Sequence, residues 1–90
     1  MSHVFKEKAK LIARVRRIRG QVEAIERGLE AECDCLEVMQ LVASVRGAMN
    51  GLMAELIEGH VDFHVVDAAE PAARRKGAKE LVDILRTYIK

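Results

Sequence analysis

Apolar residues recur along the first third of the chain at spacings of three and four, which is the pattern of one helix face. We predict a helix over residues 5–29, with Gly28 weakening its end. The basic side chains of this segment should lie together on an outer surface that faces away from the apolar residues. The apolar positions are Leu11, Val15, Ile18, Val22, Ile25 and Leu29.

A second, longer helix is predicted from residue 34 to about residue 64, because nothing in that span breaks a helix. Asp34 and Glu37 have capping-box spacing, which predicts Asp34 as the N-cap. A helix of about 30 residues is roughly 45 Å long and needs a partner along its length. Gly47 and Gly51 favour a close helix–helix crossing. Its predicted buried positions are Leu36, Met39, Val42, Val45, Met49, Leu52, Met53, Leu56 and Ile57.

Residues 65–78 form a weaker stretch that contains Pro71 and Gly77, and a third helix is predicted over about 72–89. Its apolar face is Leu81, Ile84, Leu85, Tyr88 and Ile89. The prediction is an all-α fold with one domain over residues 1–90. So short a chain buries a modest core alone, so oligomerisation is expected.

Charge is strongly segregated although the net charge is only +1. Residues 1–20 carry seven Lys and Arg against Glu7 alone, residues 21–70 have a net charge of −9, and residues 71–90 have a net charge of +4. A positive end binds a polyanion through its local field, although a basic run also occurs as a solvated helix face. The candidate DNA-contacting residues are Lys10, Arg14, Arg16, Arg17 and Arg19.

The chain shows no apolar run of bilayer length and no signal peptide, so we expect a cytoplasmic protein without membrane association. Cys33 and Cys35 are then expected as reduced thiols. No Ser/His/Asp set, phosphate-binding loop or paired-carboxylate cleft is recognisable, which predicts a protein that is not an enzyme.

Three residues carry potential metal chemistry: Cys35, His60 and His64. The two histidines are four apart on the long helix and share a face, although such a pair alone is also common in protein cores. Cys35 lies roughly 37 Å away along a straight helix. An antiparallel copy of the helix, crossing near residues 47–51, would bring Cys35 of one chain to the histidines of the other. The alternative interpretation of Cys35 is a small buried hydrophobic residue.

The N-terminus offers further ligands. Removal of Met1 would leave the Ser2 amine next to His3, although terminal residues are commonly frayed. An amine, three imidazoles and one thiolate form a nitrogen-rich set that suits Ni(II) or Co(II), whereas Cu(I) favours thiolates and Zn(II) closed tetrahedral sites. Cys33 is interpreted as a loop thiol.

The sequence resembles the CsoR/RcnR/FrmR family of bacterial transcriptional repressors over essentially its whole length. The matching segments are RVRRIRGQV at 14–22, VRGA at 45–48, NGLM at 50–53 and TYIK at 87–90. The resemblance implies a three-helix protomer, an antiparallel four-helix core in a dimer, and a homotetramer built as a dimer of dimers. It also implies operator DNA binding that is released on sensing.

Within this family, the set Ser2, His3, Cys35, His60 and His64 looks like that of the nickel/cobalt sensor, RcnR. The copper sensors have a second cysteine where this chain has His64. The formaldehyde sensor shares Cys35 and His60, but it has a proline at position 2 and lacks His64. Cys33 departs from the RcnR pattern.

The hypothesis is therefore a repressor that binds double-stranded operator DNA without metal and is released by Ni(II) or Co(II), with Zn(II) possible in vitro. Its release would derepress metal efflux. One alternative is a formaldehyde-responsive repressor that uses Cys35 and the Ser2 amine. The other is a helical metal-storage or hydrolytic protein that does not contact DNA.

Overall fold

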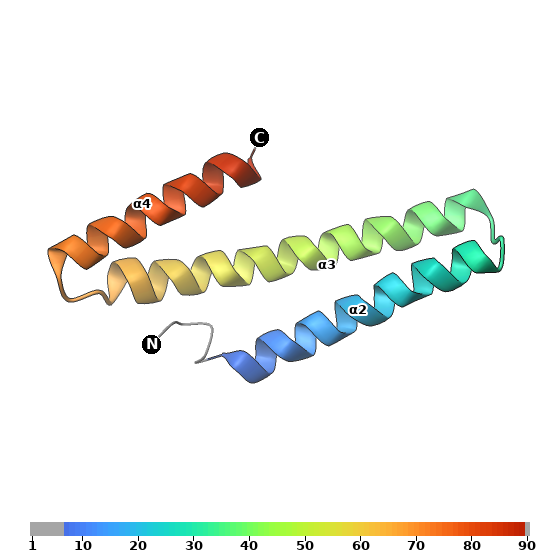
Figure 1. Cartoon of the computed structure of the whole chain (residues 1–90), viewed down its shortest axis with the longest axis horizontal. Coiled ribbons are helices and arrows are strands. Elements are labelled where there is room, and N and C mark those ends of the chain that lie inside the picture. Colours follow the sequence, from blue (N-terminus) through green and yellow to red (C-terminus); the bar gives the residue numbers. More distant parts are fainter. Residues whose placement is uncertain (1–6, 90) are drawn as a thin grey trace. The chain divides into compact units, whose positions relative to one another are not determined.

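The computed structural model describes residues 7–89, which form three α-helices and one short π-helix, with no strand among them. In chain order these are α2 (Lys8–Glu30), α3 (Cys35–Val61), η1 (Asp62–Val66) and α4 (Pro71–Tyr88), as Figure 1 shows. The predicted all-α fold with three helices is confirmed. Ser2 and His3 lie outside the described residues. The chain divides into two compact units, one of residues 7–53 and one that begins at Ala54.

In the first unit, α2 runs antiparallel to the beginning of α3 (Figure 1). Gln21 Nε2 on α2 donates a hydrogen bond to Ser44 Oγ on α3 at 3.3 Å. Leu11 and Ile18 are buried, as the apolar pattern predicted.

The other apolar positions of α2 do not all face α3. Val15, Val22 and Leu29 are 50%, 47% and 61% exposed. The reason is that α3 packs on a different side of α2. That side carries Arg14, Gln21 and Gly28, each one residue before an exposed apolar position. The predicted apolar face of α2 is therefore only partly covered within this chain.

Helix α2 ends in a Schellman turn. The Cys33 N–H bonds to the Gly28 carbonyl at 3.0 Å, and the Glu32 N–H bonds to the Leu29 carbonyl at 3.1 Å. Glu32 has a φ of 54°, the left-handed conformation that glycine usually supplies at this position. Gly28 therefore does not end the helix; its carbonyl accepts the bond that closes the turn.

Helix α3 begins at Cys35, directly after Asp34, and the Val38 N–H bonds to the Asp34 carbonyl at 3.2 Å. The predicted start is confirmed, but α3 ends at Val61, before the predicted residue 64. Within the single chain none of the residues of α3 is buried, so the predicted burial of its apolar positions needs a partner outside this chain. Four of the predicted core residues, Leu36, Met39, Val42 and Met49, are about half exposed.

In the second unit, η1 replaces the predicted end of the long helix, and the weak stretch shrinks to residues 67–70. Pro71 is not a break but the first residue of α4, where its missing N–H costs nothing. Arg74 holds the turn, because its Nε and Nη2 donate to the Ala68 carbonyl at 3.4 and 3.0 Å. Gly77 lies inside α4 and is its buried residue. No helix among the described residues is long and apolar enough to span a bilayer.

Candidate metal centre and nucleic-acid interface

The structure brings His60 and His64 together. Their ring centroids lie 4.8 Å apart with the planes tilted by 43°. His60 is near the end of α3, whereas His64 belongs to the π-helix η1. The predicted pair therefore forms although the two histidines do not lie on one regular α-helix. Two imidazoles at this separation are suited to binding one ion side by side.

A hydrogen bond to α4 determines which ring nitrogen of His60 carries the proton. His60 Nε2 and the Gly77 carbonyl oxygen are 2.9 Å apart, and a carbonyl only accepts, so the imidazole donates from Nε2. In the neutral ring the lone pair then belongs to Nδ1. A hydrogen bond of this kind orients a ligating histidine in metal proteins.

Gly77 also sets how closely α4 approaches η1. A Cβ at residue 77 would overlap the carbonyl oxygen of His64, a backbone atom that cannot swing aside. The ring of Phe63 meets His64 edge-on, with centroids 5.2 Å apart. The histidine pair is thus held by backbone packing on one side and by an aromatic ring on another. Sequence reasoning missed this role, although a glycine within a helical pattern was its signal.

Cys35 is exposed and is the first residue of α3, whereas His60 is the last but one. Cys35 belongs to the unit of residues 7–53, whereas both imidazoles belong to the unit that begins at Ala54. Among residues 7–89 no group of three or more His, Cys, Asp or Glu side chains is arranged to hold a metal ion. The described residues therefore group the imidazoles of His60 and His64, and this group does not include the Cys35 thiol.

Cys33 differs from Cys35 in being half-buried. Its Sγ lies over Gly28, where a Cβ would be 3.0 Å away. Desolvation raises the pKa of the Cys33 thiol, and the charge of Glu37 together with its hydrogen bond to the thiol raises it further. Because metals bind thiolates, this keeps Cys33 a poorer ligand.

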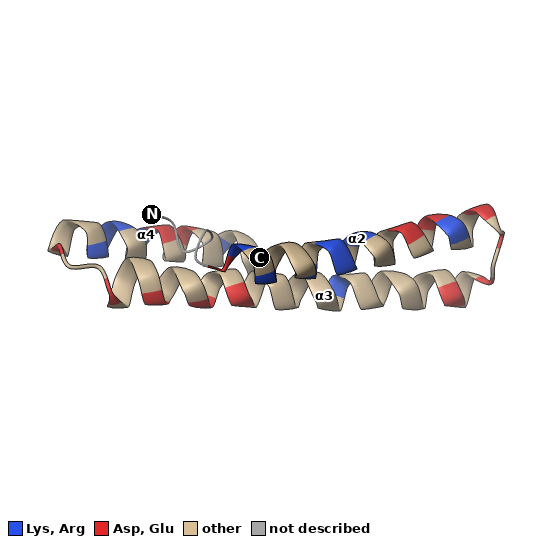
Figure 2. Cartoon of the chain, turned by 90° about the horizontal axis from the view of Figure 1, so that it is seen from below, with Lys and Arg blue, Asp and Glu red and all other residues tan. Residues whose placement is uncertain are grey.

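Four of the five predicted DNA-contacting residues, Lys10, Arg16, Arg17 and Arg19, are exposed on α2. Figure 2 shows Lys and Arg along the earlier part of α2, and mainly Asp and Glu toward its end. Arg19 makes an ion pair with Glu23 at 3.9 Å, one turn on, but both side chains are more than half exposed, so the pair is weak. The side chains of Arg16, Arg17 and Arg19 are therefore accessible from solvent.

Arg14 departs from the predicted outer surface. It is half-buried, and its guanidinium lies against Gly51 on α3. The prediction that the basic residues of α2 share one outer surface is wrong for this residue. The reason is again that α3 covers the side of α2 that carries Arg14 and Gln21.

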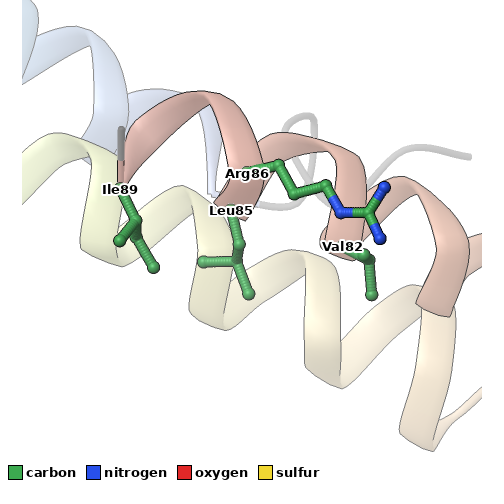
Figure 3. Close-up of a pocket in the computed structure, with 4 residues that line it drawn as sticks. All are labelled: Val82, Leu85, Arg86 and Ile89. Atoms are coloured by element: carbon green, nitrogen blue, oxygen red, sulfur yellow. The ribbon is translucent and has the colours of Figure 1, made fainter.

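An apolar hollow lies on α4 and is lined by Val82, Leu85, Arg86 and Ile89. Figure 3 shows Val82, Leu85 and Ile89 pointing to the same side of α4, while Arg86 extends along the helix. None of these side chains is a common metal ligand, so the hollow is separate in chemistry from the histidine pair.

Residues 7–87 match the family profile described as metal-sensitive transcriptional repressor. The chain belongs to this family. The repressor RcnR of Salmonella paratyphi B is 41% identical over 90 residues, covering all of both chains. An uncharacterised protein of Serratia marcescens is 50% identical over 91 residues, again covering both chains completely.

Two solved structures are similar to this metal-sensitive repressor. A variant of the formaldehyde-responsive regulator FrmR from Salmonella enterica serovar Typhimurium has a TM-score of 0.85 and 46% identity, covering 92% of this chain and 94% of that one. The copper-sensing repressor CsoR of Geobacillus thermodenitrificans has a TM-score of 0.87 over 94% of this chain and 88% of that one. At 22% identity, CsoR shows the shared fold alone.

Membership in the family settles the broad class of function. The chain is a metal-sensitive transcriptional repressor and not an enzyme, and a transcriptional repressor acts on DNA. The alternative of a storage or hydrolytic protein without DNA contact is therefore wrong.

Proposed function

We propose that this repressor senses Ni(II) or Co(II), binds operator DNA in the absence of metal and is released when metal binds. The observation that carries the proposal is the pair of imidazoles of His60 and His64, 4.8 Å apart. Nitrogen-rich sites with a single sulfur suit Ni(II) and Co(II), and Zn(II) could also occupy them in vitro. The resemblance to the RcnR ligand pattern supports the same choice.

The remaining ligands come from outside the described histidine pair. In the proposed site, Cys35 is supplied by a second copy of the chain, and the Ser2 amine and His3 by the N-terminus. An antiparallel pairing of two α3 helices about residues 47–51 would place Cys35 near the partner's histidines. This arrangement yields two equivalent sites in each dimer.

The exposed apolar residues support such an assembly. Val15 and Val22 on α2 and Met39, Val42 and Met49 on α3 are each about half exposed in the single chain. A Cβ at Gly47 would meet nothing within 4 Å, so α3 has room there for a close neighbour. Burial of these side chains between copies would stabilise a dimer at roughly 25 cal/mol per Å² of apolar surface. The proposed functional state is a homotetramer, a dimer of dimers, in the cytoplasm.

DNA binding would use the cations of α2, Lys10, Arg14, Arg16, Arg17 and Arg19, mainly against phosphates. Sequence preference would then come largely from DNA shape, because contacts to phosphates carry no sequence information. Recruitment of Ser2 and His3 to the metal site would move the start of α2, favouring a state with weaker DNA affinity. The regulated gene would encode a metal exporter.

Formaldehyde sensing is the second candidate, because the formaldehyde-responsive regulator FrmR has 46% identity to this chain and Cys35 is exposed. In that mechanism the Cys35 thiol attacks formaldehyde, and the resulting adduct loses water on crosslinking to the Ser2 amine. The candidate predicts a covalent mass increase and no tight Ni(II) binding.

A mobility-shift titration tests the proposal. The metal-free protein should retard a GC-rich operator duplex, and Ni(II) or Co(II) should release it, while formaldehyde leaves the complex intact. His64→Leu should abolish the Ni(II) response and spare DNA binding. Release by formaldehyde with a mass increase on Cys35, and none by Ni(II), would favour the second candidate.

A further inference from the structure

Arg14 occupies a different environment from the other cations of α2. Lys10, Arg16, Arg17 and Arg19 are exposed, whereas Arg14 is half-buried on the side of α2 that faces α3. It lies between the two buried residues of the helix, Leu11 and Ile18.

The end of the Arg14 side chain lies over a glycine. A Cβ added at Gly51 would be 2.6 Å from Nη1 and 3.8 Å from Cζ of Arg14. The first distance is shorter than a carbon and a nitrogen tolerate, so any side chain at residue 51 would displace the guanidinium. The displaced atom is the far end of a flexible side chain, so the backbone of α3 can stay where it is. Gly51 therefore leaves space for the Arg14 guanidinium that any side chain at residue 51 would fill.

We infer that Gly51 lowers DNA affinity by leaving space for the Arg14 guanidinium on α3, so that Arg14 reaches a DNA phosphate only after leaving this position. The inference rests on the proposed use of the α2 cations in DNA binding and adds a positioning residue on the neighbouring helix. While its guanidinium lies over Gly51, Arg14 contributes less to the exposed positive surface than Arg16, Arg17 or Arg19.

The position of the Arg14 guanidinium over Gly51 can be tested through the salt dependence of DNA affinity. Each phosphate contact releases counterions and adds about 0.9 to the slope of log affinity against log salt concentration. If Gly51→Ala frees Arg14, DNA affinity at physiological salt should rise and the slope should steepen by about 0.9. A packing defect would instead lower affinity without steepening the slope.

The experiment is a double-mutant cycle with Gly51→Ala, Arg14→Ala and both changes together, measured as a salt titration on the GC-rich duplex. In the Arg14→Ala background the Gly51→Ala change should have no effect on the slope, because the side chain it displaces is absent. Any effect of the added methyl group on assembly is the same with and without Arg14. The Gly51→Ala change in the Arg14→Ala background is therefore the matched control. A Gly51→Ala protein with an unchanged or shallower slope would overturn the inference.

A measurement on the unmodified protein covers the case in which Gly51→Ala does not assemble. In the DNA-free protein, nuclear Overhauser contacts should join the Arg14 side chain to the Gly51 Hα atoms, and saturation with the duplex should remove them. Persistence of those contacts in the complex contradicts the inference while leaving the proposed function intact. Failure of the unmodified protein to bind the duplex at all contradicts the proposed function instead.

Discussion

The Gly77 carbonyl oxygen accepts a hydrogen bond from Nε2 of His60 at 2.9 Å, across the 17 residues that separate them in the chain. This bond joins α4 to the candidate metal centre. It requires α4 to lie directly against η1, an approach that only a glycine at residue 77 permits.

Substitution of Gly77 by alanine should therefore destabilise the protein. The added Cβ would overlap the His64 carbonyl, and relief requires movement of the backbone, which costs about 1–3 kcal/mol in a packed site. Chemical denaturation at a fixed protein concentration measures the free energy of unfolding. Gly20→Ala is the control, because its Cβ meets nothing within 4 Å and should stabilise α2 by up to about 1 kcal/mol. Equal effects of the two changes would contradict the packing argument.

Subunit complementation tests the proposed shared metal site. Neither the Cys35→Ser protein nor the His60→Leu, His64→Leu double variant should bind Ni(II) tightly by itself. A dimer formed from one chain of each kind retains one complete site, because the intact thiol and the intact imidazoles come from different chains. Equilibrium dialysis of differently tagged, co-purified chains should detect one ion per mixed dimer. Mixed dimers without tight binding would contradict the antiparallel arrangement.

Replacement of Arg17 by alanine should weaken DNA binding through the loss of one phosphate contact. The slope of log affinity against log salt concentration should fall by about 0.9. Isothermal titration with Ni(II) should give the same affinity as the unmodified protein. Arg27→Ala, near the acidic end of the same helix, is the matched control and should change the slope less. A similar loss from both variants would show that net charge, rather than the proposed surface, governs binding.

The Cys33 thiol should titrate at higher pH than an ordinary cysteine, because desolvation and Glu37 raise its pKa. The folded chain therefore keeps this proton to higher pH than the unfolded chain. The resulting contribution to stability is present below the ordinary thiol pKa and is lost as the pH rises above it.

The rate of iodoacetamide modification against pH, followed by mass spectrometry in a Cys35→Ser background, measures this titration. Glu37→Gln should shift the midpoint to lower pH, since it removes a negative charge beside the thiol. Glu30→Gln provides the charge-matched control. If the Glu37→Gln midpoint does not move, Glu37 is not a cause of the raised pKa.

Glu32→Gly should stabilise the turn between α2 and α3. Glu32 has a φ of 54°, which costs a residue with a side chain about 1 kcal/mol relative to glycine. Thermal unfolding should show a higher midpoint for this variant. Glu30→Gly, in the last helical position of α2, should lower it, because glycine weakens a regular helix.

Local patterns in the sequence determined much of the secondary structure. The apolar spacing identified α2 and α4, and Asp34 correctly marked the residue before α3. Such signals act between residues close in the chain, through capping, helix periodicity and backbone preference. The pairing of His60 with His64 was also predicted from the sequence, because residues four apart on a helix lie on one face.

Tertiary packing decided what local patterns leave open. Which side of α2 is covered depends on how α3 packs against it, and this packing turned Arg14 inward and left Val15 exposed. In the sequence, Gly77 stood in a weak stretch and Gly51 favoured a close helix–helix crossing. In the structure each receives a group from elsewhere in the fold: the His64 backbone at one and the Arg14 guanidinium at the other. A glycine's missing side chain matters only when something else occupies the space, and the occupant comes from a segment distant in the chain.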